Sequence, residues 1–348
     1  MAETTYRNRR AVQIQNERVR VTVLVEGGHI AEILDKSTGV NPLWTPPWPS
    51  IEPSEYDRAK HPIYGSDAES KLLGGIMGHN LCLDIFGGVS TEEAAAGLTV
   101  HGEASVAKYE ITSSRAALTM HAAFPYAQLA LSRSISLDGD RVIIDETVEN
   151  LTATDRPIGW TQHVTMGPPF IERGRTQFDA TCTRSKVYEG EFAAGGYMKT
   201  AAEFNWPMVP DNDGGTVDLR TYTDRPISGG YTAHLMDPAR PVSYFSAWSP
   251  SHQLLFGYVW KREDFPWMGI WEENHSRTAP PWNGQALTRG MEFGVSPMPE
   301  TRRQMIDRGS MFGVPGYRWI PARCKASVRY YAFIRPAAGL GMAPEWSI

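Results

Sequence analysis

The chain lacks the features that mark disulfide-built, membrane-spanning or nucleic-acid-binding proteins. It has 3 cysteines in 348 residues, at positions 82, 182 and 324, too few and too scattered for a disulfide framework or a zinc knuckle. No apolar run approaches the roughly 18 residues of a membrane helix, and the N-terminal segment has no unbroken apolar stretch of the kind found in secretory signals. With 34 basic and 39 acidic residues, it carries no electrostatic surface for nucleic acid or an anionic membrane. We therefore expect a cytoplasmic protein with reduced thiols.

Helical patterns are also scarce, whereas aromatic residues, glycine and proline are abundant. The chain contains 11 Trp, 14 Tyr and 12 Phe together with 32 Gly and 25 Pro, a composition typical of strands joined by tight turns. Only residues 91–96 and 300–308 indicate short helices. The proline-rich segment 41–53 cannot be a central strand, because each proline removes a hydrogen-bond donor from the ladder, so we predict a long loop over a sheet end.

Strict alternation of apolar residues predicts antiparallel strands. It runs through residues 19–25, and the glycine pair 27–28 then turns the chain into a second strand. A second hairpin is predicted within residues 129–148, preceded by further alternation in 118–124. No linker, repeat or change in composition divides the chain. We therefore predict one all-β domain spanning 1–348, built from two large stacked antiparallel sheets with few short helices.

The common catalytic motifs are missing, which directs attention to isolated polar residues. The chain has no His-x-His or His-Glu-x-x-His metal motif, no Gly-x-Ser-x-Gly elbow, no P-loop and no dinucleotide fingerprint. Three polar residues stand in apolar, turn-rich settings: His101 beside a glycine, His163 shortly after a polar turn, and Glu292 between Met291 and Phe293. Taken singly, each also fits a hydrogen-bonded structural residue.

Taken together, these residues resemble the galactose mutarotase (aldose 1-epimerase) family in order and spacing. That family has a His-Gly pair in its first third, a histidine after an N-x-T turn at mid-chain, and a late glutamate in a segment of the form L-E-x-Q-x-x-P. Its G-R-x-x-N-R-I stretch, which carries a sugar-binding asparagine, resembles GGIMGHN at 74–80. The corresponding residues here are Asn80, His101 and Gly102, His163 after the N-L-T turn at 150–152, and Glu292 followed by Pro297.

The resemblance implies a supersandwich fold and the interconversion of sugar anomers. It assigns Glu292 as the base that removes the proton of the C1 hydroxyl and His163 as the acid that protonates the ring oxygen. His101 would donate a hydrogen bond near that oxygen, and Asn80 would bind the sugar. Ring opening, rotation about C1–C2 and reclosure need one acid and one base, with no cofactor and no metal. The apolar residues on either side of the glutamate are expected to raise its pKa.

A tryptophan-rich segment, residues 266–282, is a second candidate for contact with a sugar. The apolar face of a pyranose packs against an aromatic ring while its hydroxyls seek polar groups. If the segment is a strand, Trp271 and Glu273 point to one face and Glu272 to the other. We predict Trp271 and Glu273 as substrate-binding residues, although tryptophans in the core and solvated acids would give the same pattern.

Differences from the family pattern keep other functions open. The family's hydroxyl-binding aspartate would fall in SGGYTAHLM at 228–236, which has no carboxylate, and its glutamine after the glutamate is Gly294 here. A non-catalytic carbohydrate-binding β sandwich is therefore one alternative to the isomerase. A lyase or glycosidase that draws an acid/base pair from Glu272, Glu273 and Glu292 is another. In every case the expected partner is a sugar or sugar derivative, and the sequence indicates neither a phosphate on it nor an oligomeric state.

Overall fold

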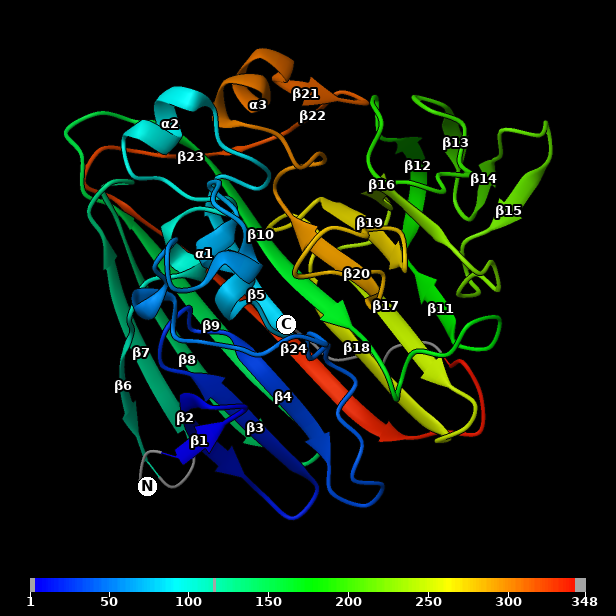
Figure 1. The fold of residues 1–348 in the computed structure, drawn as a ribbon, viewed down its shortest axis with the longest axis horizontal. Helices are drawn as coiled ribbons and strands as arrows, with labels where there is room; N and C mark the ends of the chain where they lie inside the picture. The colour runs from blue at the N-terminus through cyan, green and yellow to red at the C-terminus, as the bar shows by residue number, and fades with distance from the viewer. Residues whose placement is uncertain (1–3, 115–116, 342–348) are drawn as a thin grey trace.

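The computed structural model describes residues 4–114 and 117–341, and it confirms the predicted all-β class. Strands account for 47% of the residues and helices for 8%. The three cysteines are free thiols, as predicted. Two large sheets run through the molecule, and every strand in them is antiparallel to its neighbours (Figure 1).

Within the described residues the larger sheet has twelve strands. Eleven of them follow in the spatial order β1 (Thr4–Tyr6), β2 (Arg9–Gln15), β3 (Val19–Leu24), β4 (Ile30–Asp35), β5 (His79–Asp84), β10 (Arg156–Met166), β20 (Leu287–Gly294), β19 (Trp267–Asn274), β16 (Ser228–Met236), β12 (Cys182–Val187) and β13 (Glu203–Asn205). The twelfth, β23 (Arg318–Ile320), pairs with the start of β10. The hairpin predicted from the alternation at 19–25 is confirmed as β3 and β4.

The smaller sheet has eight strands within the same residues. Their order is β11 (Gln177–Ala180), β17 (Val242–Ser249), β18 (Leu254–Lys261), β24 (Lys325–Pro336), β9 (Arg141–Asn150), β8 (Leu129–Asp138), β7 (Ala117–Phe124) and β6 (Glu110–Ser113). The predicted antiparallel run is confirmed in β7, β8 and β9, with Gly139 at φ 61° in the turn between the last two. Two small hairpins lie outside the large sheets: β14 (Met208–Pro210) with β15 (Thr216–Asp218), and β21 (Ser310–Met311) with β22 (Val314–Pro315).

The described helices are short and lie in the connections. The two predicted ones are α2 (Thr91–Ala95) and α3 (Arg302–Arg308), each begun by a capping box, on Ser90 and on Thr301. The sequence did not predict α1 (Ser70–Gly75) or the single turns η1 (Pro53–Glu55), η2 (Pro62–Tyr64) and η3 (Glu103–Ser105). None of these helices is long and apolar enough to cross a membrane.

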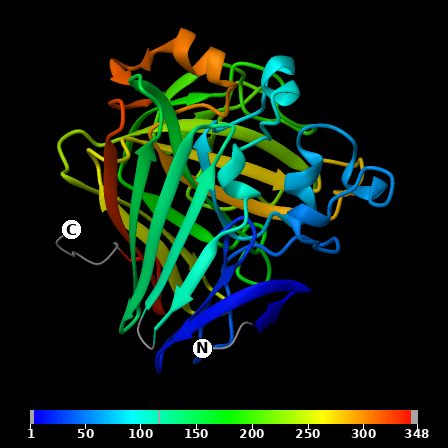
Figure 2. The same ribbon diagram turned by 90° about the vertical axis from the view of Figure 1, so that its left-hand side faces the viewer.

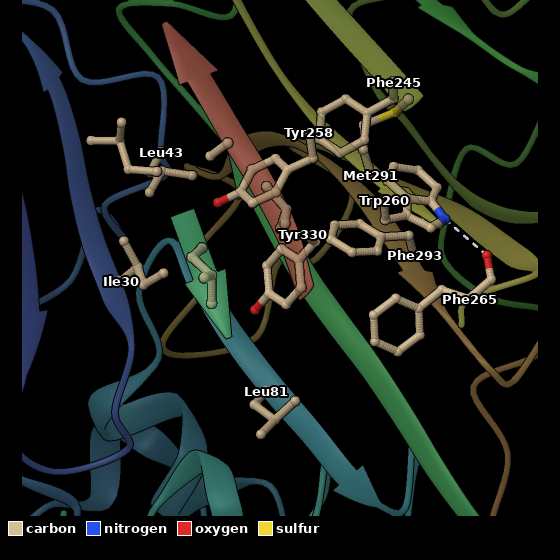
Figure 3. Packing of buried hydrophobic residues seen from close by; sticks show 14 of the residues in the cluster. Ile30, Leu43, Leu81, Phe245, Tyr258, Trp260, Phe265, Met291, Phe293 and Tyr330 are labelled. Carbon is tan, nitrogen blue, oxygen red and sulfur yellow. Dashed lines mark hydrogen bonds between the residues drawn. The ribbon is translucent and has the colours of Figure 1, made fainter. Parts of the chain in front are cut away.

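The main core lies between the two sheets and fixes which way each strand faces. Figure 3 shows Phe293 of β20 among aromatic side chains of the smaller sheet. Its ring stacks on Trp260 of β18, with centroids 4.2 Å apart, and lies 5.4 Å from the ring of Tyr330 on β24. Successive side chains on a strand point to opposite faces. Glu292, the neighbour of Phe293, therefore projects from the outer face of the larger sheet.

Long connections cover that outer face. Figure 2 shows the blue segment that carries residues 41–75 on the side of the molecule opposite the red strand β24. The proline-rich stretch 41–53 contains no strand, as predicted, and its tryptophans pack onto the sheet. Trp44 stacks on Trp282 with centroids 6.0 Å apart, and Trp48 donates a hydrogen bond to the carbonyl of Leu73 at 2.8 Å. A second, tryptophan-rich cluster thus forms under these connections.

Candidate functional site

The pairing of three central strands brings Asn80, His163 and Glu292 into one row. His163 on β10 lies directly opposite Glu292 on β20 and directly opposite Asn80 on β5. Side chains at paired positions point to the same face and are close neighbours. The Nε2 atom of His163 lies 3.0 Å from Oε1 of Glu292. Sheet register alone thus places the predicted acid and base against each other.

His101 reaches the same place from a connection, through unusual backbone geometry. His101 and Gly102 both have left-handed φ values, 66° and 77°. The carbonyl of His101 accepts a hydrogen bond from the backbone N–H of Leu83 on β5, at 3.2 Å. A Cβ on Gly102 would lie only 2.1 Å from the carbonyl oxygen of Leu83, so this position needs glycine. As a result, the ring of His101 lies beside that of His163, with the two ring centroids 4.7 Å apart.

Of these side chains, all but Asn80 line a cavity of about 70 Å³ on the outer face of the larger sheet. His101, His163 and Glu292 form the polar part of its inner end, and Trp271 and Tyr231 form aromatic walls. The ring of Trp271 is centred 5.7 Å from that of His163. The structure therefore places four of the predicted site residues around one pocket.

Polar atoms without protein partners gather at this site. Among the described residues, Nδ1 of His101, Nε1 of Trp271 and Nδ2 of Asn80 are buried with no hydrogen bond. Oε1 of Glu292 has only the contact with His163, which is not aligned as a hydrogen bond. Leaving a buried polar group unsatisfied costs about 1–3 kcal/mol, so such groups are rare in native proteins. Other such atoms occur elsewhere in the described chain, but these four lie at or beside one pocket, which is typical of a site that binds a polar ligand.

Burial shifts the pKa of both central groups. It raises the pKa of Glu292 well above its usual value and lowers the pKa of His163 to about 4, because a buried charge is poorly solvated. It also lowers the pKa of His101 well below its usual value. Both shifts favour the uncharged carboxyl and the uncharged imidazole over the ion pair, although the two groups lie 3.0 Å apart.

The cause of the raised Glu292 pKa differs from the one that the sequence suggested. Met291 and Phe293 flank it in sequence, but both belong to the core between the sheets and point away from the carboxylate. The alternation of side chains along β20 separates them from it. The apolar side chains that share the outer face and the pocket with Glu292 include Trp271 and Tyr231.

Two predicted site residues do not line the pocket. Asn80 is fully buried beside His163, and its Oδ1 lies 3.8 Å from the sulfur of Cys82. Glu273 is also fully buried, and its carboxylate accepts hydrogen bonds from both the backbone N–H and the hydroxyl of Ser276, each at 2.7 Å. Glu273 thus shapes the turn that follows β19, and Arg277 comes directly after Ser276 in this turn.

The faces of β19 agree with the sequence prediction. Trp271 lies on the outer face with the pocket, and Glu272 points the other way. There the carboxylate of Glu272 accepts hydrogen bonds from Arg289 at 2.9 Å and from Ser228 at 2.6 Å. Glu272 therefore belongs to the interior between the sheets and not to the candidate site.

Sequence reasoning missed two charged residues at the more exposed end of the pocket. Arg277 lies over the faces of Trp282 and Trp271, 4.7 and 5.6 Å from the ring centroids. It forms ion pairs with Glu273 at 3.5 Å and with Glu69 at 3.9 Å. Glu69 comes from the start of the unpredicted helix α1, so only the position of Arg277 in a tryptophan-rich segment could have indicated this pair.

Comparison with known proteins gives a fold but no sequence family. No family model matches the chain, and no curated protein matches it. A solved structure from Klebsiella pneumoniae, named provisionally as an aldose 1-epimerase, is 12% identical with a TM-score of 0.65, over 95% of this chain and 80% of that one.

Two further solved structures resemble the chain over nearly the whole length of both partners. A galactose mutarotase related enzyme from Lactobacillus acidophilus is 11% identical with a TM-score of 0.61, over 95% of this chain and 100% of that one. A galactose mutarotase-like protein from Clostridium acetobutylicum is 13% identical with a TM-score of 0.60, over 96% and 98%. The chain therefore has the galactose mutarotase-like fold that its sequence predicted.

Proposed function

We propose that this chain is an aldose 1-epimerase-like isomerase that interconverts sugar anomers. The observation that carries the proposal is the 3.0 Å contact between His163 and Glu292 in a pocket edged by unpartnered polar atoms. Glu292 points into the pocket that also holds His101 and His163, as proton transfer to and from one sugar requires. A binding protein would not need an acid and a base in contact.

The reaction needs two proton movements on one pyranose. Glu292 removes the proton of the C1 hydroxyl while His163 protonates the ring oxygen; the C1–ring oxygen bond breaks and C1 becomes a carbonyl. Rotation about C1–C2 and the reverse transfers give the other anomer, and no atom is gained or lost. The reactive form carries a proton on His163 and none on Glu292; the carboxylate gains one proton as the imidazole loses one, so the reverse transfers restore this form after each turnover. His101, with its unpartnered Nδ1, is placed to hydrogen-bond the ring oxygen or a neighbouring hydroxyl.

The charges around the pocket support an uncharged sugar. Arg277 is the only lysine or arginine lining it within the described chain, and its ion pairs with Glu69 and Glu273 already balance its charge. A phosphate would meet an excess of negative charge there. Trp271 offers both a flat apolar face and an unpartnered N–H, the two features that bind a sugar ring and its hydroxyls.

The lyase or glycosidase alternative has weaker support. It requires a second carboxylate that faces Glu292 across the pocket, at roughly 5–10 Å. Glu272 lies on the other face of its strand, and Glu273 is held by the turn that follows β19. The other carboxylate that lines the pocket in the described chain is Glu69, which is ion-paired with Arg277.

Saturation-transfer NMR of α/β exchange over a panel of aldoses, ketoses and sugar phosphates tests the proposal. Wild type should accelerate exchange of an uncharged sugar. Glu292→Gln should reduce the rate by about 100-fold or more, because it removes a proton acceptor and keeps the shape, while calorimetric affinity changes far less. Glu110→Gln, at an exposed position on β6, is the matched control and should leave the rate unchanged.

Two results would replace the proposal with one of its alternatives. Wild type that binds a sugar but leaves exchange at the spontaneous rate would indicate a binding protein. Release of nitrophenol from nitrophenyl glycosides, lost in Glu292→Gln, would indicate a glycosidase.

A further inference from the structure

A second cavity, of about 460 Å³, lies beside the candidate site. It is formed by the connection 187–200 and by the start of β16, and it shares Phe192 and Tyr231 with the smaller pocket. Ligand pockets usually measure about 300–1,000 Å³. The 70 Å³ pocket falls below that range, whereas the neighbouring cavity lies within it.

The glycine pair at 229–230 explains how this connection lies against the sheet. A Cβ on Gly229 would lie 2.6 Å from Cβ of Ala193, and one on Gly230 would lie 2.3 Å from Cε of Met198. The end of the Met198 side chain can move aside but Cβ of Ala193 cannot, so at position 229 glycine is what lets the connection approach this closely. The segment SGGYTAHLM therefore carries a covering loop where the mutarotase pattern has a hydroxyl-binding carboxylate, and the loop brings new side chains to the site.

The chemistry of the cavity lining suits a carbohydrate. Tyr188, Phe192 and Tyr231 supply aromatic surface, and the rings of Phe192 and Tyr231 stack with centroids 5.7 Å apart. Asn212 and Thr200 add neutral polar side chains, and Glu191 adds one carboxylate. The lining contains no lysine or arginine within the described chain, so it does not suit an anionic ligand. Aromatic platforms with a few neutral polar groups are typical of sites that bind sugar rings.

We propose that the two cavities together bind the reducing end of an uncharged di- or oligosaccharide. This inference rests on the proposed function: C1 of the reducing sugar must lie against His163 and Glu292. C4 is at the opposite end of a pyranose ring, so a sugar linked there points away from this pair. The next sugar occupies the 460 Å³ cavity, and Phe192 and Tyr231 form the wall that both sugars contact.

Paired binding measurements test this subsite. Calorimetry compares maltose, cellobiose, lactose and xylobiose with the monosaccharides glucose and xylose, and NMR follows anomer exchange of the reducing sugar. At least one disaccharide should bind about tenfold or more tightly than its own reducing monosaccharide, equivalent to about 1.4 kcal/mol. The affinity measured by calorimetry does not depend on catalytic turnover.

A cavity-filling variant locates the effect. Gly196 lines the large cavity, and a Cβ there would make only ordinary contacts, the nearest at 3.6 Å. Gly196→Phe should remove most of the disaccharide preference. The matched control is Gly339→Phe, which should retain the disaccharide preference. An added Cβ at Gly339 would meet nothing within 4 Å, and this residue is far from the lining residues in sequence.

Each remaining outcome contradicts a named claim. Disaccharides that bind no more tightly than their monosaccharides would overturn the subsite and leave the isomerase proposal standing if exchange is observed. A preference that survives in Gly196→Phe would show that the second sugar lies elsewhere. Absence of binding by any sugar of the panel would contradict both proposals.

Discussion

At the scale of single residues, Glu292 and His163 owe their chemistry to where the strands place them. Their neighbours in sequence face the opposite side of the sheet, so the pKa shifts come from residues brought together by folding. The sequence supplied the identity of both residues through a resemblance of motifs. It could not supply the unpartnered atoms of Trp271 and His101, because these depend on the packing of distant connections.

Gly290 tests the placement of the carboxylate without removing it. A Cβ at this position would lie 2.4 Å from Oε1 of Glu292, the movable end of a side chain. Gly290→Ala should therefore displace the carboxylate, and a misplacement of about 1 Å can lower a catalytic rate by about 100-fold. The exchange rate measured by NMR should fall while the melting temperature changes little. Gly339→Ala is the control, and equal rates in the two variants would refute this placement.

At the scale of elements, local hairpins were predictable and the site's central pairing was not. Strands β3 with β4, and β7 through β9, follow one another in sequence, so alternation and turn residues reveal them. The pairing of β5, β10 and β20 joins segments far apart in sequence, and no local pattern encodes it. The six-residue helix α1 is too short for a periodic signal, so Glu69 could not be foreseen.

The connection that carries His101 gives an element-scale prediction. Gly102→Ala puts a Cβ 2.1 Å from the backbone oxygen of Leu83 and forces alanine to a φ of 77°. Backbone cannot move aside as a side-chain end can, so the variant should lose about 2 kcal/mol or more of folding free energy and shift His101. Urea unfolding and exchange NMR measure the two effects. Wild-type stability would show that the His-Gly pair has no geometric role.

At the scale of the whole molecule, a buried polar network joins the two sheets. The carboxylate of Glu146 on β9 accepts hydrogen bonds from Arg133 at 2.8 Å, Tyr330 at 2.7 Å and Trp160 at 3.0 Å. All four side chains are almost fully buried. Breaking one partner of such a network leaves others unsatisfied, so the network favours one alignment of the sheets over others.

Buried neutral histidines should make the protein sensitive to acid. Burial lowers the pKa values of His29, His79 and His234 to about 3, below the value of 6.5 for an exposed histidine. Above pH 6.5 these groups are neutral in both states. Between pH 6.5 and about 3 the unfolded chain binds protons that the folded chain does not, so stability falls as the pH falls, by about 1.4 kcal/mol per pH unit for each histidine.

His234 allows this slope to be measured at one site. Its Nδ1 contacts Ser185 Oγ at 2.8 Å and its Nε2 contacts Thr232 Oγ1 at 2.8 Å, both within the larger sheet. His234→Gln keeps a polar side chain that does not titrate. Calorimetry measures the free energy of unfolding from pH 6.5 to 4. Its slope against pH should be shallower in the variant than in wild type by about the contribution of one proton. An unchanged slope would show that His234 is protonated in the folded state.

The central claim is that Glu292 and His163 act as one proton-transfer unit, and a double-mutant cycle measures this directly. Saturation-transfer NMR gives the α/β exchange rate for wild type, Glu292→Gln, His163→Asn and the double variant, with circular dichroism as the check of folding. The exchange rate of each single variant should be about 100-fold below that of wild type. The double variant should be hardly slower than either, because both residues serve the same proton-transfer step. Losses that multiply in the double variant, or rates equal to wild type, would contradict the account.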